Sequence, residues 1–307
     1  MNALTIPSAN GLQHRTLIDA FLQGRTPDTR RAYGQDVADF AAFLGVPDID
    51  AAARTLLSQE PGTANLIVLE YRTHLSERDL APATINRRLA SLRSLVKLAR
   101  TIGVVTWALD ISNIRAQSYK DTRGPGVYRV RRMISEAESR GDSKGRRDSA
   151  ILHLLFDLGL RRGEVCKLDL ADVDLPESAI HVLGKGRLEK ERLSLPEPTK
   201  RALATCIDDR GTEPGPLFLS RSGRRLDGSS LYYIVRKIGE SIGIKTRPHG
   251  LRHSGITEAV KAATANGMDL TEVLPFSRHR NVSTLQVYRD TERDTQGKLA
   301  AMVAGTG

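Results

Sequence analysis

In the first hundred residues of the chain, prolines and glycines lie at positions that predict where helices begin and end. Thr26 is suited to cap a helix, Pro27 fits the first helical position, and Gly45 is a residue that stops a helix. The segment between them carries apolar residues at helical spacing, namely Tyr33, Val37, Phe40 and Leu44. We therefore expect a helix that starts at Thr26 and Pro27 and stops at Gly45.

Two further helices are predicted in the same part of the chain. One spans about 63–76, and the other opens after Pro82 and runs to about Ile102, before Gly103. The second of these keeps strict helical spacing at its apolar positions, which are Ile85, Leu89, Leu92, Val96 and Ala99. Residues 12–103 are thus expected to form an all-α N-terminal domain.

The charge balance favours a polyanion as the partner. Lys and Arg total 46 against 36 Asp and Glu, which gives a formal net charge of +10. Two predicted helices carry candidate contacts to DNA, and these are Thr29, Arg30, Arg31, Arg87, Arg88, Arg93 and Lys97. Helix N-termini and basic side chains both suit phosphate oxygens, although an ordinary solvated basic surface remains the alternative.

Residues 104–125 lose the helical pattern and run into a Gly-Pro-Gly turn, which is typical of a linker between domains. Residues 126–307 are then expected to form a second domain. Cys166 and Cys206 are too few and too far apart for a disulfide framework or a Cys-rich zinc site. The sequence lacks a secretion signal and a long unbroken apolar run, so we expect a cytoplasmic protein that does not enter membranes.

The second domain is predicted to be of the α+β class. Helices are expected near 126–140 and 146–158, and Glu164 begins a short helix in which its carboxylate can fix the local turn or an arginine. Residues 179–183 and 191–195 alternate around apolar positions, which predicts a β-hairpin. Lys185 lies in the connection of this hairpin, between Gly184 and Gly186.

A set of polar residues in this domain suits one chemistry, and it consists of Arg161, Lys185, His249, Arg252, His279 and Tyr288. Pro248 fits a first helical position, which places His249 and Arg252 on one face of a helix. Each motif is weak alone. Together they offer cations and imidazoles to surround one phosphate, with a tyrosine hydroxyl to attack it.

The competing interpretation is a metal site at the compact carboxylate cluster Asp169, Asp172 and Asp174. Their spacing lacks the glycine turn of a calcium loop. Capping and surface solvation are the expected roles, and we expect no metal and no cofactor.

Taken in order, the motifs resemble the tyrosine recombinase, or phage integrase, family, and more closely its Xer-like two-domain members. The N-terminal resemblance lies in TRRAYGQDVADFAAFLG and LAPATINRRLASLRSLVKLAR, and the C-terminal one in GLRRGEVCKLDLADVDL, GKG, HGLRH and RHRNVSTLQVY. It implies a mainly helical two-domain clamp on duplex DNA. The N-terminal core-binding domain would have a SAM-like fold, and the α+β catalytic domain a small antiparallel sheet.

The resemblance implies site-specific recombination through a covalent 3′-phosphotyrosine, without metal or ATP. Arg161 and Arg252 would clamp the non-bridging oxygens, and Tyr288 would be the nucleophile. Lys185 is expected to protonate the leaving 5′ oxygen. His249 would act as the general base or as a hydrogen-bond donor, and His279 would donate to a non-bridging oxygen.

Two features depart from the family pattern. Residues 259–269 (AVKAATANGMD) form a segment a few residues longer than in Xer-like proteins, which predicts a longer loop. Arg278 stands where a glycine usually precedes the second histidine, and it adds positive charge next to the site.

The expected partners are double-stranded DNA with paired recombination sites, further copies of the chain in a tetramer, and accessory factors that set direction. Within residues 289–307, GKLAAMVA is the apolar helical candidate for docking on a neighbouring subunit, through Leu299 and Met302. Two other classes stay open. A type IB topoisomerase-like enzyme would relax DNA as a monomer, and a DNA-binding regulator would lack catalysis.

Overall fold

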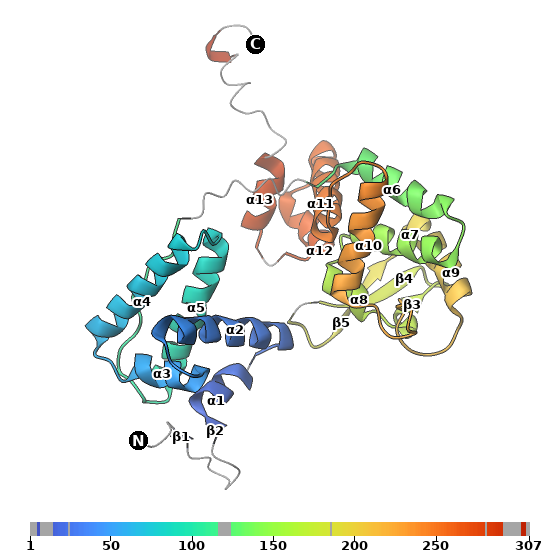
Figure 1. Ribbon diagram of the computed structural model, residues 1–307. Helices are drawn as coiled ribbons and strands as arrows, with labels where there is room; N and C mark the ends of the chain where they lie inside the picture. The colour runs from blue at the N-terminus through green and yellow to red at the C-terminus, as the bar shows by residue number, and fades with distance from the viewer. Residues whose placement is uncertain are drawn as a thin grey trace. The chain divides into compact units, whose positions relative to one another are not determined.

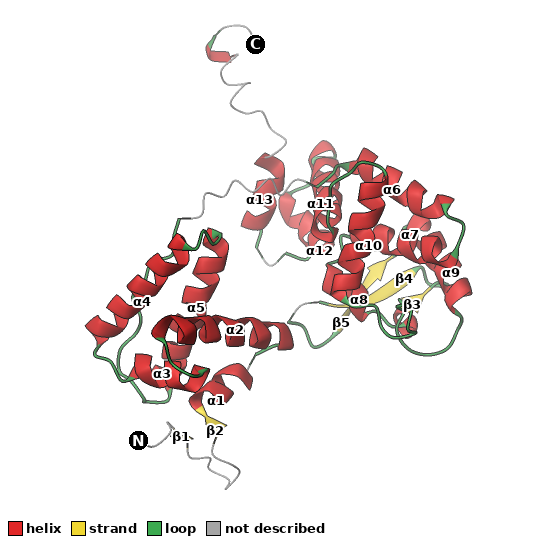
Figure 2. Cartoon of the chain, in the orientation of Figure 1, coloured by secondary structure: helices red, strands yellow, loops and turns green. Residues whose placement is uncertain are grey.

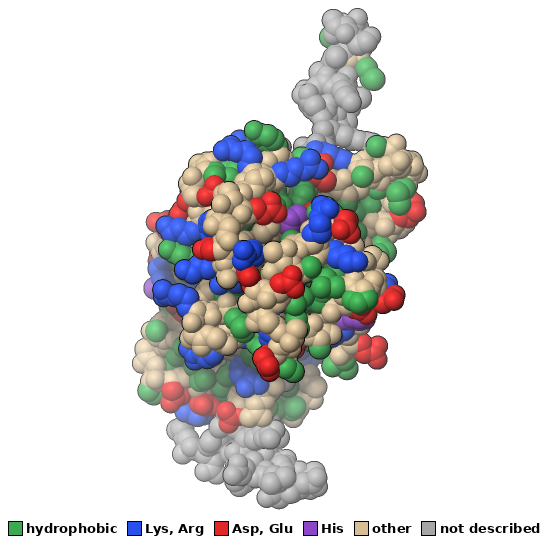
Figure 3. Space-filling model, turned by 90° about the vertical axis from the view of Figure 1, so that its right-hand side faces the viewer, with side chains coloured by type: hydrophobic (Ala, Val, Ile, Leu, Met, Phe, Trp, Pro, Cys, Tyr) green, Lys and Arg blue, Asp and Glu red, His purple; other side chains and the backbone are tan. Residues whose placement is uncertain are grey.

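The computed structural model describes residues 5–6, 15–23, 25–115, 124–184, 186–279, 281–290 and 302–304. The chain divides into two compact units, residues 1–120 and 121–307 (Figure 1). No helix within these described ranges is both long and apolar enough to cross a bilayer. On the face seen in Figure 3, basic and acidic side chains are interspersed, so the net charge does not by itself mark a binding surface there.

The first unit is helical. Its helices are α1 (Leu17–Gln23), α2 (Pro27–Leu44), α3 (Ile49–Leu57), α4 (Pro61–Glu77) and α5 (Pro82–Thr101). The three predicted helices are confirmed as α2, α4 and α5, whereas α1 and α3 were not predicted. A short antiparallel pair of strands, β1 (Thr5–Ile6) and β2 (Arg15–Thr16), precedes α1 and adds to the all-α domain that we expected.

Local capping explains the bounds of α2. Thr26 has an extended backbone, and its hydroxyl oxygen accepts a hydrogen bond from the Thr29 backbone N–H at 3.4 Å. Pro27 occupies the first turn, where a missing N–H has no cost. Gly45 ends the helix in the left-handed conformation, with φ 68°, which glycine adopts without strain. The residues at the two ends of α2 therefore determine where this predicted helix begins and stops.

The segment after α5 corrects the predicted linker. Val105, Leu109 and Ile111 are buried in the core of the first unit. The Asn86 amide donates to the Ile114 carbonyl oxygen at 2.9 Å and accepts from the Ile114 backbone N–H at 2.8 Å. Residues 104–115 thus belong to the first unit, and residues 116–123 lie outside the described residues.

The second unit combines helices with a small sheet (Figure 2). Its helical elements are α6 (Val127–Ser139), α7 (Ser143–Phe156), α8 (Arg162–Lys167), η1 (Leu170–Asp172), α9 (Glu197–Arg210), α10 (Gly228–Ser241), α11 (Pro248–Ala265), η2 (Leu270–Val273), α12 (Leu274–Ser277) and α13 (Ser283–Asp290). The sheet consists of β3 (Val173–Asp174), β4 (Ala179–Leu183) and β5 (Lys190–Ser194), in that order and antiparallel. The predicted α+β class and hairpin are confirmed, and β3 was not predicted.

Helix α7 is the centre of this unit, because it packs against α6, α9 and α11. Its buried apolar residues include Ala150, Ile151, Leu152, Leu154 and Leu155. A second, smaller apolar cluster lies apart from this main core and contains Ile256, Val260, Ala263, Val273, Leu285 and Tyr288. Helix α13 is therefore attached to the unit through this satellite cluster.

A glycine allows α11 to approach α7 closely. A Cβ atom added to Gly255 would lie 2.1 Å from the carbonyl oxygen of Phe156, near the end of α7. Such a contact forces the two helices apart. Because α11 begins with His249 and Arg252 while α7 leads into Arg161, this contact sets the distance between two parts of the predicted site.

We expect Gly255→Ala to lower the free energy of unfolding by about 1–3 kcal/mol, because overpacking displaces α11 from α7. Gly163→Ala is the matched control, since a Cβ there meets nothing within 4 Å. Urea unfolding followed by circular dichroism measures both. Equal stability of the two variants would show that the α7–α11 contact adapts freely.

Candidate active site

Arg161 is held in place at the junction between α7 and α8. Gly159 takes the left-handed conformation with φ 55°, and Arg161 then caps α8. The buried carboxylate of Glu164 accepts from the Arg161 backbone N–H at 2.7 Å and from Arg161 Nη1 at 2.9 Å. The expectation that Glu164 fixes the local turn or an arginine is confirmed, because it does both.

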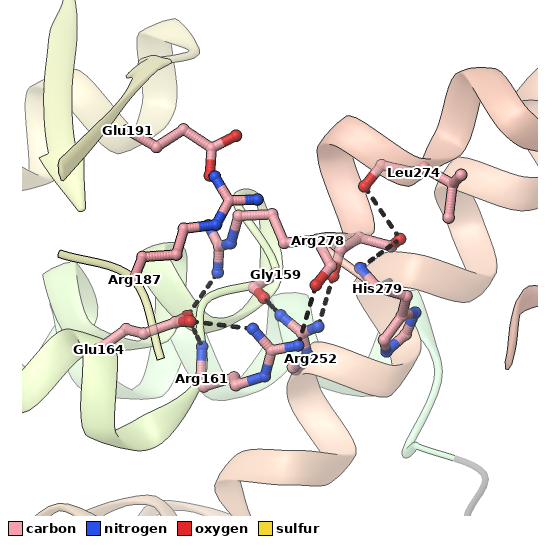
Figure 4. A network of polar contacts seen from close by, with 10 residues as sticks. Gly159, Arg161, Glu164, Arg187, Glu191, Arg252, Leu274, Arg278 and His279 are labelled. Carbon is pink, nitrogen blue, oxygen red and sulfur yellow. Dashed lines mark hydrogen bonds and ion pairs between the residues drawn. The ribbon is translucent and has the colours of Figure 1, made fainter. Parts of the chain in front are cut away.

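Arg252 is brought to the same place by the first turn of α11, in which Pro248 is the first residue. Arg252 is 2% exposed, and its guanidinium donates to the carbonyl oxygens of Gly159 and Ser277, the latter at 2.5 Å. Arg161 Nη2 donates to the carbonyl oxygen of Arg278 at 3.1 Å. The two arginines therefore meet at one loop, residues 277–279 (Figure 4).

The charges at this junction lower one another's affinity for protons. Burial, followed by the charges of Arg161 and Arg278, lowers the pKa of Arg252 to about 10. The guanidinium therefore still carries its charge at pH 7. Burial likewise lowers the pKa of Arg278, despite the opposing effect of Glu164. Positive charge gathered where water is scarce is suited to binding an anion.

His279 lies beside the two arginines. Its backbone N–H donates to the Ser277 hydroxyl at 3.4 Å. Its Nδ1 atom is buried and makes no hydrogen bond to the residues that the structure describes. Burial and the nearby charges of Arg252 and Arg161 lower the pKa of His279 to about 4. The ring is therefore neutral at pH 7.

His249 is the more open of the two predicted histidines. It lies exposed in the first turn of α11. Partial desolvation lowers its pKa, and so do the charges of Arg252, Arg247 and Arg161. A neutral imidazole can accept a proton, which suits the expected role as a base.

Tyr288 completes the arrangement from α13. Its side chain is 5% exposed, and its ring centroid lies 6.0 Å from that of His279. Burial raises the pKa of Tyr288, and the charges of Arg252 and Arg161 oppose that rise. The structure thus brings Arg161, Arg252, His279 and Tyr288 together, as the sequence predicted.

His253 was not predicted as a site residue. It follows Arg252, is buried, and its ring lies against that of Tyr288 at a centroid distance of 4.3 Å and an interplanar angle of 32°. Its place in the HGLRH motif was the available signal. The sequence motif does not show which element covers His253, so its contact with Tyr288 appears only in the fold.

Lys185 lies outside the described residues, so its predicted place in the site stays a prediction. The strands that flank it, β4 and β5, are described. Arg187, in the connection of this hairpin, and Glu191 of β5 form an ion pair of 3.1 Å and border a cavity of about 440 Å³ that Arg278 and His279 also line. The hairpin therefore approaches the side of the site on which His279 lies.

The basic residues predicted to contact DNA from the first unit differ in what they do. Arg88 is largely buried and pairs with Asp39, and Arg93 donates to the Ile111 carbonyl oxygen at 2.9 Å. Both contacts lie within the first unit, and the expectation that these two arginines face DNA stays a prediction.

The others are more accessible. Arg87 pairs with the buried Asp36 at 2.6 Å but keeps 42% of its side chain exposed. Thr29 supports the cap of α2, with its hydroxyl 2.9 Å from that of Thr26. The remaining candidates are exposed, and they are Arg30, Arg31 and Lys97.

The carboxylates considered for a metal site serve the fold. Asp169 caps η1 together with Asp172, and Asp172 also pairs with Lys190 of β5. Asp174 accepts from the Glu177 backbone N–H at 3.0 Å in the turn between β3 and β4. The predicted capping roles are confirmed.

Comparison with known proteins agrees with this geometry. The sequence pattern of the phage integrase family matches residues 128–294. A tyrosine recombinase of Synechocystis sp., slr0733, is 36% identical, and the alignment covers 97% of this chain and 98% of that protein. The chain belongs to the phage integrase family of tyrosine recombinases.

Two further comparisons place this tyrosine recombinase within its family. XerC of Corynebacterium glutamicum is 28% identical over 89% of this chain and 86% of its own length. The crystal structure of the XerH site-specific recombinase, bound to a palindromic difH substrate, has a TM-score of 0.68. It is 17% identical and covers 90% of this chain and 80% of that chain, so the likeness is one of fold. The chain is a Xer-like tyrosine recombinase, as the motifs predicted.

We expect the His279 ring to stay neutral from pH 7 down to about pH 4. Its pKa in the folded protein lies below the unfolded value of 6.5, so protonation favours the unfolded chain. Stability should therefore fall as the pH drops from 6.5 towards 4. Ring-nitrogen NMR, with His279→Gln to assign the signal, measures the titration. A midpoint near 6.5 would contradict the burial of this ring among cations.

Proposed function

We propose that this recombinase cleaves and rejoins duplex DNA through a covalent bond between Tyr288 and the 3′ phosphate. The observation that carries the proposal is the meeting of Tyr288, Arg161 and Arg252 around one loop, although they come from three separate segments of the chain. A buried tyrosine beside two guanidinium groups is the arrangement that attack on a phosphodiester requires.

The two arginines suit the charge that develops during the reaction. A guanidinium group has five N–H donors, and the contacts of Arg252 with Gly159 and Ser277 use two of its nitrogens. The remaining donors of Arg161 and Arg252 can bind the non-bridging oxygens of the scissile phosphate. Charge on these oxygens grows in the transition state, so preorganised guanidinium groups stabilise it.

Tyr288 must lose its proton as it attacks. Holding a phenol with a pKa of about 10 as phenolate at pH 7 costs about 4 kcal/mol. Burial adds to this cost, and the charges of Arg252 and Arg161 reduce it. We assign proton acceptance to the neutral ring of His249 and hydrogen-bond donation to the phosphate to His279.

The cleavage step needs no co-reactant. The Tyr288 oxygen forms a bond to phosphorus, and the bond from phosphorus to the 5′ oxygen breaks. Lys185 is assigned as the donor of the proton that the 5′ oxygen takes up. The 3′-phosphotyrosine remains a phosphodiester, so a 5′ hydroxyl can reverse the step without ATP. The cationic side chains fill the role that a metal ion has in other nucleases.

The proposed partner is double-stranded DNA with paired recombination sites. The XerH structure is of a complex with difH, and a lambda integrase of similar fold (TM-score 0.61) is a dimer bound to a COC′ core site. We propose that the two units of this chain close on duplex DNA as a clamp, and that four copies assemble on two sites. Accessory factors would set direction.

The docking segment predicted at the C-terminus stays part of this proposal. Leu299 lies outside the described residues. Met302 and Val303 are described, and both are exposed, so their apolar side chains are available to a neighbouring copy.

A basic cavity borders the first turn of α11. It has a volume of about 860 Å³, and among the residues that line it are Arg129, Arg132, Arg236, Lys245, Arg247 and Gly250. Arg236 is partly neutralised by Glu240 at 2.9 Å. Gly250 follows His249 directly, so we propose that this cavity receives DNA backbone phosphates close to the scissile one.

We expect Arg132→Gln and Lys245→Gln each to reduce the slope of log affinity against log salt by about 1, because each removes one phosphate contact. Fluorescence anisotropy with a labelled duplex at several salt concentrations measures the slope. Arg146→Gln is the control, since Arg146 pairs with Asp209. Unchanged slopes in both cavity variants would place the DNA elsewhere.

The covalent step is tested with a nicked suicide duplex that bears a candidate site, without metal or ATP. Wild type should form a band that survives denaturing electrophoresis, and Tyr288→Phe should form none, because it lacks the attacking oxygen. A band retained by Tyr288→Phe would overturn the nucleophile. Binding without any band would favour a DNA-binding regulator. Relaxation of supercoiled DNA without strand exchange between paired sites would favour a topoisomerase-like enzyme.

A further inference from the structure

Arg278 has the least favourable surroundings of the residues at the site. Its backbone is left-handed, with φ 49° and ψ 35°, which side chains other than glycine rarely adopt. Its side chain is 4% exposed, and Nε and Nη1 make no hydrogen bond to the described residues. A strained backbone and a buried charge both destabilise a protein, so interactions elsewhere must offset them.

The contacts of Arg278 converge on Arg161. Arg278 Nη2 donates to Glu164 Oε2 at 2.5 Å, and the same carboxylate binds the backbone and the guanidinium of Arg161. The Arg278 carbonyl oxygen accepts from Arg161 Nη2 at 3.1 Å. Figure 4 shows the contacts of Arg161 and Arg278 with the Glu164 carboxylate. Arg278 thus acts on Arg161 through its side chain, by way of Glu164, and directly through its backbone.

Arg278 changes the net charge around Glu164. A lone pair of Arg161 and Glu164 is neutral overall and attracts a phosphate weakly. With Arg278 added, two guanidinium groups share one buried carboxylate, and the trio carries one surplus positive charge. Glu191 also lies near Arg278, but it pairs with Arg187 at 3.1 Å, and the charge of Arg187 opposes its effect on the pKa of Arg278.

We propose that Arg278 is a positioning residue for the phosphate-binding arginine. By sharing Glu164, it leaves Arg161 with surplus charge, and through its carbonyl it fixes the direction of the Arg161 guanidinium. This inference rests on the proposed function, because it assigns the scissile phosphate as the anion that Arg161 binds.

Arg278→Gly is the informative variant, because glycine keeps the left-handed backbone while the charge is removed. We expect covalent complex formation in a single turnover to slow roughly tenfold, the size of effect that follows when one interaction specific to the transition state is lost. Affinity for the duplex should change by about twofold or less. The rising limb of the pH–rate profile should move to higher pH, since less positive charge disfavours the phenolate. Arg278→Lys should restore part of the rate.

Coupling to Glu164 separates this role from a merely structural one. Glu164→Gln removes the charge but keeps an oxygen for the cap of α8. If Arg278 acts through Glu164, Arg278→Gly should slow the reaction by only about twofold in the Glu164→Gln background. A full tenfold loss in both backgrounds would overturn the proposal.

Ser178→Gly controls for the backbone, since Ser178 is also left-handed, with φ 48°, and its hydroxyl binds Lys200 and none of these residues. It should leave the rate unchanged. A rate for Arg278→Gly equal to that of wild type would show that Arg278 has no positioning role.

Phosphate binding can be measured without cleavage, and this separates the role of Arg278 from the proposed covalent reaction. Inorganic phosphate, compared with chloride at equal ionic strength, should raise the melting temperature of wild type more than that of Arg278→Gly. An equal rise in both would contradict the role of Arg278. A smaller rise in Arg278→Gly, in a protein that forms no covalent complex, would support the charge sharing and defeat the proposed reaction.

Discussion

One buried carboxylate allows three guanidinium groups to gather in the second unit. Arg161, Arg252 and Arg278 repel one another, and burial lowers the pKa of the latter two. Glu164 and the carbonyl oxygens of the chain around the site provide the negative charge that opposes this repulsion. The remaining positive charge is what a bound phosphodiester would neutralise. The fold therefore holds these like charges close together before any phosphodiester is bound.

The parts of the fold that follow from local chemistry could be predicted from the sequence. Helix α2 was predicted because Thr26, Pro27 and Gly45 set its ends by themselves. The sequence did not predict helices α1 and α3, because they are short and their apolar residues are buried only by packing on other helices of the first unit. Residues 104–125 are predicted to be a linker because their sequence loses the helical pattern, whereas the burial of residues 104–115 depends on contacts with the helices of the first unit, α5 among them.

In the site, too, some features follow from the local sequence and others depend on distant contacts. The residue types and their order predicted which side chains meet, but not what each one contacts. The sequence predicts Arg88 and Arg93 as DNA contacts, but it does not show that they also bind Asp39 and the Ile111 carbonyl oxygen within the first unit. The role of Arg278 depends on a left-handed backbone and on Glu164, more than a hundred positions earlier in the chain. No local pattern reports such a contact.

The attachment of α13 to a satellite cluster has a consequence for how the nucleophile is held. Leu285 and Tyr288 pack with residues of α11 and η2, apart from the main core around α7. Local opening costs less free energy where few buried side chains are lost, so this helix can detach without unfolding the unit. Arg161 and Arg252, which would bind the phosphate, and Tyr288, which would attack it, thus belong to regions of different local stability. Amides of α13 are accordingly expected to exchange with solvent by a separate, lower-energy opening than those of α7.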